Sequence, residues 1–299
     1  MKLAVFSILA GVSLGGLATY SARAQTLVAD PQSLLGPQSS SRGGTSIASP
    51  VGHDALFSNP AAAAFSDRYS INFGYVGAGD GLAASVVDTK SGPVGGALYY
   101  LKRDFKRTPD SNPSAGPFAR LEERAGGALF GRISPNVSFG TNIKYTYRRA
   151  HDSIVSTTSQ WTFDVGALFR ATDELSIGAV GQNLVGDDSS LNPRSMGAAA
   201  SYRVGSALFL NVQVNKLLEL DTAVVGSGFG YGVGADYLLP QNFTLRAGYR
   251  DTGLYKEKLM SAGLGYESKT FGASYSFQFG VGGSGKKAQI HGVQISGYL

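Results

Sequence analysis

Strict alternation of apolar and polar residues over most of the chain is the feature that most limits its fold. From Tyr69 onward, runs of about nine to fourteen residues follow a two-residue period, which is the period of a β-strand. In residues 136–148, for example, Val137, Phe139, Ile143 and Tyr145 share one face, and mostly polar residues share the other. Residues 160–170, 243–250 and 271–279 repeat this division. The sequence therefore predicts an all-β protein.

Two kinds of connection alternate between the expected strands. Tight turns are expected at residues 134–135, 171–174, 205–206, 240–241 and 268–269, and longer polar loops at residues 104–119, 150–158, 183–194, 216–226, 251–257 and 281–287. A soluble β-sandwich also alternates, but short turns at one end and long loops at the other are typical of an outer-membrane barrel. The rhythm gives about fourteen strands, an even number that places both termini on the periplasmic side.

A sheet that faces lipid must close on itself. In hydrocarbon no water satisfies a free strand edge, and each unpaired N–H or C=O group costs several kcal/mol. We therefore expect residues 69–299 to form a transmembrane antiparallel β-barrel of about 14 strands in contact with outer-membrane lipid.

The N-terminal residues follow the pattern of a secretory signal peptide. Met1-Lys2 supplies the positive start, residues 3–18 are apolar, and Ala22-Arg23-Ala24 forms a small-x-small cleavage site. We expect residues 1–24 to be removed after Ala24 and the mature chain to be exported to the bacterial outer membrane.

Composition excludes several classes of protein and site. The chain has no Cys, which rules out disulfides, thiolate metal sites and Cys nucleophiles. Removing Lys2 and Arg23 from the formal charge of +5 leaves about +3, which is too mild and scattered to indicate nucleic-acid binding. No run of 18 or more apolar residues follows the N-terminus, so helical membrane proteins are excluded as well.

Residues 25–68 lack the strand pattern and are interrupted by Pro31, Pro37, Pro50 and Pro60. They could form a disordered periplasmic extension or an N-terminal hatch folded inside the barrel. The size of the lumen favours a hatch, because about fourteen strands leave a space that must hold water or protein.

A stripe of glycines gives a second indication of a hatch. Gly228, Gly230, Gly232 and Gly234 all fall on the inward face of one expected strand. Such a stripe indicates either close approach of another backbone or a bend in the strand, and the glycines alone do not distinguish the two.

The same N-terminal region resembles a known family. The N-terminal signature of the FadL-like superfamily of long-chain fatty-acid transporters is similar to Ser41-Arg42-Gly43-Gly44, Ala48, Asp54-Ala55 and Asn59-Pro60-Ala61. The related PorV and PorQ outer-membrane proteins share that pattern. The resemblance implies a fourteen-stranded barrel whose N-terminal hatch blocks the lumen. It also implies that Arg42, Gly43, Gly44, Asn59, Pro60 and Ala61 form the hatch motif, in which Pro fixes its own φ and Asn bonds nearby backbone.

No catalytic or metal-binding constellation stands out. Residues 280–287 approach a phosphate-binding loop, but Lys287 replaces the Ser or Thr that would hold Mg²⁺, and no helix follows. His53, His151 and His291 lie in different regions without the spacing of metal ligands. We therefore expect no enzyme, no cofactor and no metal.

Charged residues on the expected inward faces are the better functional indication. Lys144, Arg148, Arg170, Arg246 and Arg250, together with Asp164 and Asp236, would line the lumen. Charged rings tune the passage of ions and solutes through pores. The alternative is that these groups pair with one another or with hatch carbonyls and serve only the structure.

These observations favour a hatch-gated passive channel for small hydrophobic molecules. The alternative is a PorV-like binding or assembly component that conducts nothing and presents loops to a periplasmic or secreted protein partner.

Overall fold

A computed structural model describes residues 36–49, 52–76, 80–107, 118–151, 155–186, 192–218, 228–253, 257–282 and 289–299. The expected signal peptide and most of residues 281–287 lie outside these ranges. None of the described helices is both long and apolar enough to cross a membrane.

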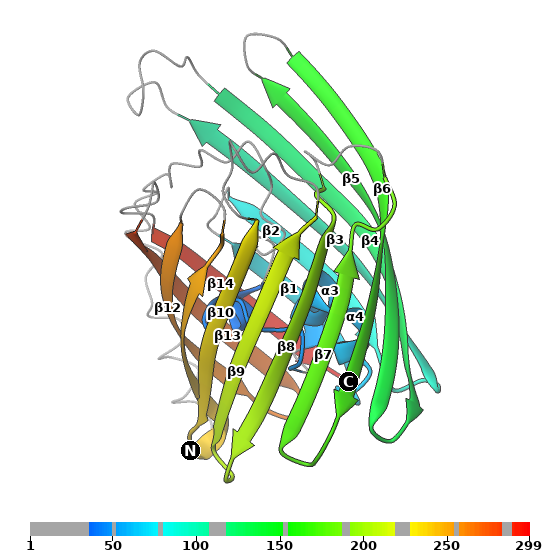
Figure 1. Cartoon of the computed structure of the whole chain (residues 1–299), viewed down its shortest axis with the longest axis vertical. Coiled ribbons are helices and arrows are strands. Elements are labelled where there is room, and N and C mark those ends of the chain that lie inside the picture. The colour runs from blue at the N-terminus through cyan, green and yellow to red at the C-terminus, as the bar shows by residue number, and fades with distance from the viewer. Residues whose placement is uncertain are drawn as a thin grey trace.

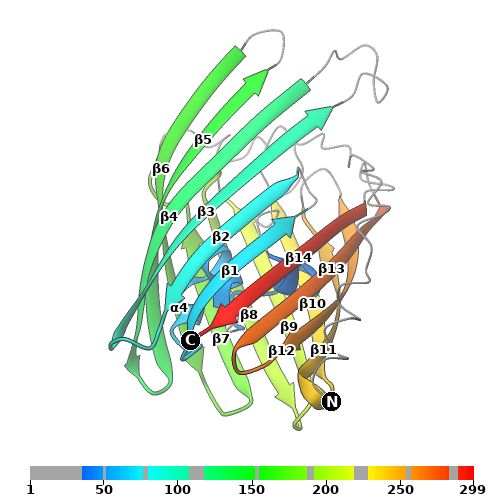
Figure 2. The same ribbon diagram turned by 180° about the vertical axis from the view of Figure 1, so that it is seen from behind.

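Fourteen antiparallel strands close into one barrel, in which each strand pairs with its sequence neighbours and β1 also pairs with β14 (Figures 1 and 2). The strands are β1 (Tyr69–Val76), β2 (Gly81–Asp88), β3 (Val94–Arg107), β4 (Phe118–Ser134), β5 (Val137–His151), β6 (Val155–Arg170), β7 (Leu175–Gln182), β8 (Ser195–Val204), β9 (Leu208–Leu217), β10 (Phe229–Leu238), β11 (Phe243–Asp251), β12 (Lys258–Glu267), β13 (Phe271–Gly282) and β14 (Gln289–Tyr298). The fourteen-strand fold predicted from the sequence is confirmed, and its first strand begins at Tyr69 as expected.

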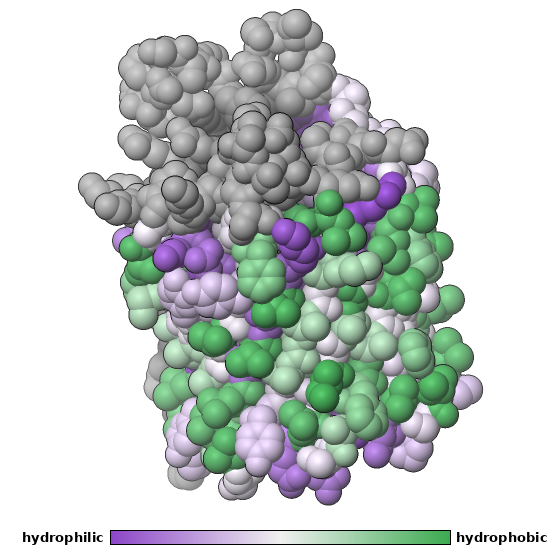
Figure 3. All heavy atoms as spheres, viewed as in Figure 1, coloured by the Kyte–Doolittle hydropathy of each residue, from purple (hydrophilic) through white to green (hydrophobic). Residues whose placement is uncertain are grey.

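The two-residue period of the sequence separates the two faces of the wall. Side chains such as Phe73, Leu98 and Ile143 are exposed on the outside, whereas Asn72, Asn142 and Gln213 are buried on the inside. Figure 3 shows the apolar residues that cover much of the lower part of the barrel on the face in view. An apolar exterior around a polar interior is the reverse of a soluble domain and is typical of a transmembrane barrel.

Strands β3 to β6 extend farther than the rest and form a sheet that projects above the barrel (Figures 1 and 2). They contain 14, 17, 15 and 16 residues, whereas β1, β2 and β7 contain 8 each. The loops predicted at residues 104–119 and 150–158 are therefore longer than the connections in the structure, because the strands on both sides extend into the predicted ranges. The polar residues there belong to paired strands, because inter-strand hydrogen bonds can continue in water beyond the apolar band.

The described residues between 36 and 67, called the inner segment below, lie within the barrel. They form α2 (Pro37–Ser40), the 3-10 helix η2 (Gly52–Asp54), α3 (Ala55–Ser58) and α4 (Pro60–Ala63). These short helices appear in blue inside the wall in Figure 1. Nearly all of the described residues from Gly36 to Phe65 are buried, although no helix exceeds 4 residues. Such short helices depend on the surrounding wall for their stability.

Candidate functional site

The lumen, with the inner segment inside it, is the candidate functional site. Asn59 lies at the centre of this arrangement and is fully buried. Its side-chain oxygen accepts a hydrogen bond from the Ala61 N–H at 3.1 Å, so Asn59 is the N-cap of α4, and Pro60 occupies the first helical turn. The Asn59 amide donates to the carbonyls of Ile47 at 2.8 Å and Ala167 at 3.0 Å. One side chain thus shapes the turn and joins it to β6.

Arg42, Gly43 and Gly44 form a second attachment on the opposite side of the lumen. The Arg42 guanidinium donates to the Asp236 carboxylate at 2.8 Å, and the Gly43 N–H donates to Ser261 at 3.0 Å. Gly43 and Gly44 have φ values of 71° and 75°, which glycine adopts without strain. A side chain on Gly43 would also collide with the backbone of Val233 and Tyr249. The paired glycines therefore let the chain turn against the wall.

Hydrogen bonds from many strands hold the rest of the inner segment. The donors or acceptors on the wall are polar side chains that the two-residue period points inward, as expected for a barrel interior. They are Ser85 on β2, Ser138 and Asn142 on β5, Gln182 on β7, Asn211 and Gln213 on β9, and Gln278 on β13.

The glycine stripe on β10 agrees only in part with the prediction that it faces a hatch. A Cβ on Gly232 or Gly234 would collide with the backbone oxygen of Gly43 or Arg42, so these two glycines make room for the inner segment. The nearest neighbours of Gly230 are instead backbone atoms of Asp251 and Thr252, and Gly228 precedes β10 with a φ of 63°, so for these two glycines contact with a hatch stays a prediction. The register of β10 with β9 and β11 is continuous, and close approach of the inner segment accounts for the glycines at 232 and 234.

Apolar packing joins the inner segment to β2–β6. Leu56 and Ala61 are fully buried, and the Phe57 ring meets the Tyr99 ring edge-on with centroids 4.9 Å apart. The inner face of β3 is therefore apolar in part, at Ala97, Tyr99 and Leu101. His53 packs against Phe57 at 5.1 Å and its Nδ1 lies 2.5 Å from the Ser85 hydroxyl. Burial lowers the pKa of His53, although the nearby Asp54 carboxylate opposes the shift.

Asp236 is shared by two arginines. Besides Arg42, the Arg246 Nε lies 3.3 Å from the Asp236 carboxylate, and all three side chains are buried. Arg250 is also buried on β11. The structure therefore brings predicted lumen residues together with a predicted residue of the hatch motif.

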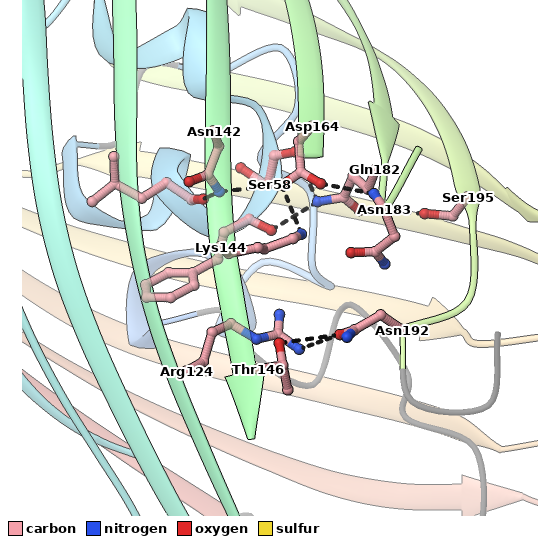
Figure 4. Close-up of polar contacts among 12 residues, drawn as sticks. Ser58, Arg124, Asn142, Lys144, Thr146, Asp164, Gln182, Asn183, Asn192 and Ser195 are labelled. Atoms are coloured by element: carbon pink, nitrogen blue, oxygen red, sulfur yellow. Dashed lines mark hydrogen bonds and ion pairs between the residues drawn. The ribbon is translucent and has the colours of Figure 1, made fainter. Parts of the chain in front are cut away.

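A second buried ion pair joins Lys144 and Asp164 at 2.7 Å (Figure 4). The Asp164 carboxylate also accepts hydrogen bonds from the Asn142 amide at 3.1 Å and from the Asn183 N–H at 2.8 Å. Both charged residues were expected in the lumen, and each has its charge satisfied by a neighbour on the wall.

The sequence analysis missed the most heavily charged group in the lumen. Glu122 on β4 is fully buried and accepts hydrogen bonds from Arg103 at 2.9 Å and Arg148 at 3.1 Å, and Arg124 lies 3.8 Å away. Only Arg148 was expected to line the lumen. Arg103 and Glu122 were missed because they stand at or beside a presumed loop. If the two-residue period had been followed through Glu122 and Arg124, it would have shown that both residues lie on the same face of the strand.

The described residues at the two ends of the expected outer loop 183–194 also depart from their expected place. Asn183 has a φ of 57° and turns the chain inward. At the other end, the side-chain oxygen of Asn192 accepts a hydrogen bond from Arg124 at 3.0 Å (Figure 4). The side-chain amide of Asn192 donates to Gln160 at 3.1 Å. The described ends of this connection are therefore folded against β4 and β6 inside the wall.

Arg170 occupies the short-turn end of the lumen and is only half-buried. Its guanidinium lies 3.8 Å from the centroid of the Phe65 ring, which is a cation–π geometry. Arg170 therefore contacts the end of the inner segment, apart from the other lumen charges.

The site as a whole is a lumen lined largely by polar side chains, in which the described residues of the inner segment contact the wall. The ion pairs named above favour the structural interpretation of the lumen charges over an open charged ring. Within the described ranges, no group of three or more His, Asp or Glu side chains could hold a metal ion.

Comparisons with known proteins identify the fold. No family model matches the sequence, and no curated protein matches it. Among solved structures, the CymD monoaromatic hydrocarbon channel aligns with a TM-score of 0.70 and 13% identity, over 89% of this chain and 97% of that one. The Ralstonia pickettii toluene transporter TbuX aligns with a TM-score of 0.70 and 11% identity, over 89% and 98%. A Pseudomonas aeruginosa FadL homologue aligns with a TM-score of 0.61 and 13% identity, over 88% of this chain and 98% of that one. The chain thus has the fold of FadL-type barrels.

Proposed function

We propose that this chain is an outer-membrane channel through which small hydrophobic molecules diffuse passively, with the inner segment as its hatch. In this proposal residues 1–24 are cleaved after Ala24, residues 25–68 form the hatch and residues 69–299 form the barrel. The observation that carries the proposal is a closed wall, apolar outside and polar inside, around a segment attached only by noncovalent contacts. The toluene and monoaromatic hydrocarbon named for the similar structures indicate the class of solute.

Passage requires the inner segment to move, because its residues fill the bore at mid-height. Ala55, Leu56 and Ala61 are fully buried between the segment and the wall. Their contacts are many and individually weak, typically about 1 kcal/mol for each hydrogen bond. Local displacement of the segment therefore leaves the closed wall intact, since every strand keeps both of its neighbours.

The channel proposal is tested by removing the hatch. Deletion of residues 25–60 is expected to raise the flux of a small solute into liposomes, whereas deletion of residues 25–35, which spares the inner segment, is expected to leave it unchanged. Uptake of labelled toluene by cells that express the full chain should exceed uptake by cells with an empty vector. Equal flux for both deletions would contradict the hatch.

A non-conducting binding component, as in PorV, is the second candidate. The observation that favours it is the completeness of the plug, because the inner segment bonds to strands on every side of the lumen. In this case toluene uptake would match that of the empty vector, and deletion of residues 25–60 would leave the flux unchanged.

A further inference from the structure

Within the described ranges, the projecting part of β6 has a partner strand on one side only. β6 pairs with β5 along its whole length, from Val155 to Phe169. Its pairing with β7 covers only Val165 to Arg170, and one further hydrogen bond joins the Leu184 N–H to the Phe163 carbonyl at 2.8 Å. Among the described residues, no strand pairs with the β7 side of residues 155–162. We call this side the β6 edge.

The hydrogen-bond pattern identifies the groups at the β6 edge. The Arg170 N–H donates to Asn136 on the β5 side, whereas the Phe163 carbonyl faces the β7 side. Successive residues of a strand alternate in direction, so even-numbered residues of β6 bond to β5 and odd-numbered residues face away from it. Thr157, Ser159 and Trp161 therefore direct their backbone N–H and C=O groups along the β6 edge, and all three side chains are exposed.

The sequence of the β6 edge differs from that of the other free margin of the projecting sheet. Proteins commonly protect an exposed edge strand from pairing with charges, particularly Lys, or with Pro. β3 has such charges beyond its last pair with β2, at Arg103, Asp104, Lys106 and Arg107. Residues 155–163 contain no charged residue, no Pro and no Gly, and are rich in Thr and aromatic residues that favour strands. The β6 edge is therefore suited to pairing.

We infer that the β6 edge binds an extended, acidic peptide segment of a partner protein, which adds to the sheet as an antiparallel strand in line with β7. Main-chain hydrogen bonds supply affinity in this mode of recognition, and alternate side chains supply specificity. The expected acidity follows from Arg149 of the neighbouring strand β5, which stands opposite Thr157, whereas Arg148, opposite Thr158, already pairs with Glu122. Their side chains fall on the two faces of the sheet, and Arg149 is exposed.

The β6 edge is accessible from water. Unpaired backbone groups are too costly to leave in hydrocarbon, so residues 157–161 lie at or beyond the membrane boundary. The position of Trp161 agrees, because its side chain is 64% exposed and its ring lies 5.1 Å from that of Tyr145. Paired aromatics of this kind occupy the membrane–water interface.

A second copy of the chain fits the β6 edge poorly, an argument that rests on the proposed membrane insertion. Copies inserted in one direction are related by an axis along the membrane normal. Strands tilted by roughly 35–45° would then cross steeply and could not lie side by side. A flexible segment of another protein has no such restriction.

Peptide binding to the full chain in detergent micelles tests the inference. The probe is a short synthetic peptide that alternates threonine and glutamate. One control peptide has the same sequence with methylated backbone nitrogens, and another has lysine in place of glutamate. Trp161 is the only Trp, so its emission reports events at the β6 edge, and amide exchange at Thr157 and Ser159 reports backbone pairing.

The Thr/Glu peptide is expected to shift Trp161 emission and to slow exchange at Thr157 and Ser159, and both control peptides are expected to have no effect. Ser159→Pro removes one edge N–H and should weaken binding about fivefold, as expected for about 1 kcal/mol per hydrogen bond, whereas Ser159→Ala should bind normally.

Four results would overturn the inference. The first two are binding of the methylated peptide or of the lysine peptide as tightly as the Thr/Glu peptide. The third is slow amide exchange at the β6 edge when no peptide is present, and the fourth is burial of Trp161 because the chain associates with itself. The peptide controls keep the test decisive if Ser159→Pro fails to fold.

Discussion

The Arg42 guanidinium donates a hydrogen bond to the Asp236 carboxylate at 2.8 Å, although the two residues lie 194 positions apart in the sequence. Both side chains are less than a tenth exposed, and Arg246 shares the same carboxylate. Asp236 therefore balances one cation from the inner segment and one from the wall. This arrangement makes the inner segment sensitive to a single charge on β10.

Asp236→Asn should release the inner segment more strongly than Arg42→Met. The first change leaves two buried arginines without their carboxylate, at a cost of about 3–5 kcal/mol, whereas the second leaves the Arg246–Asp236 pair intact. The natural chain has no Cys, so thiol labelling of Ser46→Cys in the buried segment reports its exposure. Asp236→Asn should accelerate labelling about a hundredfold or more. Equal rates for the two variants would contradict this account.

Gly234→Ala should displace the inner segment without disturbing the strand. A Cβ at this position would collide with the Arg42 carbonyl. The matched control is Gly297→Ala on β14, where a Cβ meets no atom within 4 Å. We expect faster labelling of Ser46→Cys with Gly234→Ala and wild-type labelling with Gly297→Ala. If both variants label at the wild-type rate, the close approach at Gly234 has no energetic importance.

Glu122→Gln should destabilise the projecting sheet. The substitution keeps the shape of the side chain but removes the negative charge near Arg103, Arg124 and Arg148, and this should cost about 3–5 kcal/mol. Glu267→Gln is the control, because Glu267 and Arg68 form an exposed pair worth at most about 1 kcal/mol. The temperature at which the folded barrel loses its distinct gel mobility measures the effect. A midpoint as high as that of Glu267→Gln would refute the prediction.

Acid should loosen the inner segment through His53. Burial lowers the pKa of His53 in the docked state, so the undocked state binds the proton more readily. The stabilisation of the docked state by neutral His53 is complete above about pH 6.5, which is the ordinary pKa of His. It is lost as the pH falls below this value, by at most about 1.4 kcal/mol per pH unit. Labelling of Ser46→Cys, corrected for the intrinsic reactivity of the thiol, should therefore increase between pH 7 and pH 5. His53→Gln should remove this dependence, and persistence of it would assign the effect to another group.

Local patterns were sufficient to place some residues of the barrel on inward faces. Lys144 and Asp164 were placed on inward faces from the two-residue period alone, and the start of the barrel at Tyr69 followed from the same signal. The period does not tell which inward residues meet across the lumen. The Arg42–Asp236 pair and the contacts of Gly232 and Gly234 with the inner segment depend on how distant strands close into a ring.

The errors in the sequence analysis have a common physical cause. Polar composition was taken as the sign of a loop, so Glu122 and Arg103 were not considered as lumen residues. Hydrogen-bonded strands can extend into water, where polar residues suit both faces, and composition then no longer marks the end of a strand. The inward turn at Asn183 was missed because a single residue of positive φ leaves little signal in a polar segment.

The sequence by itself determined a closed barrel of fourteen strands, since apolar and polar residues alternate along the chain and a lipid-facing sheet cannot leave its edges unpaired. Only the tertiary structure decided the pairing of buried charges, the place of the inner segment and the unmatched length of β6. These features depend on register and closure between residues far apart in the chain, and no local pattern specifies them.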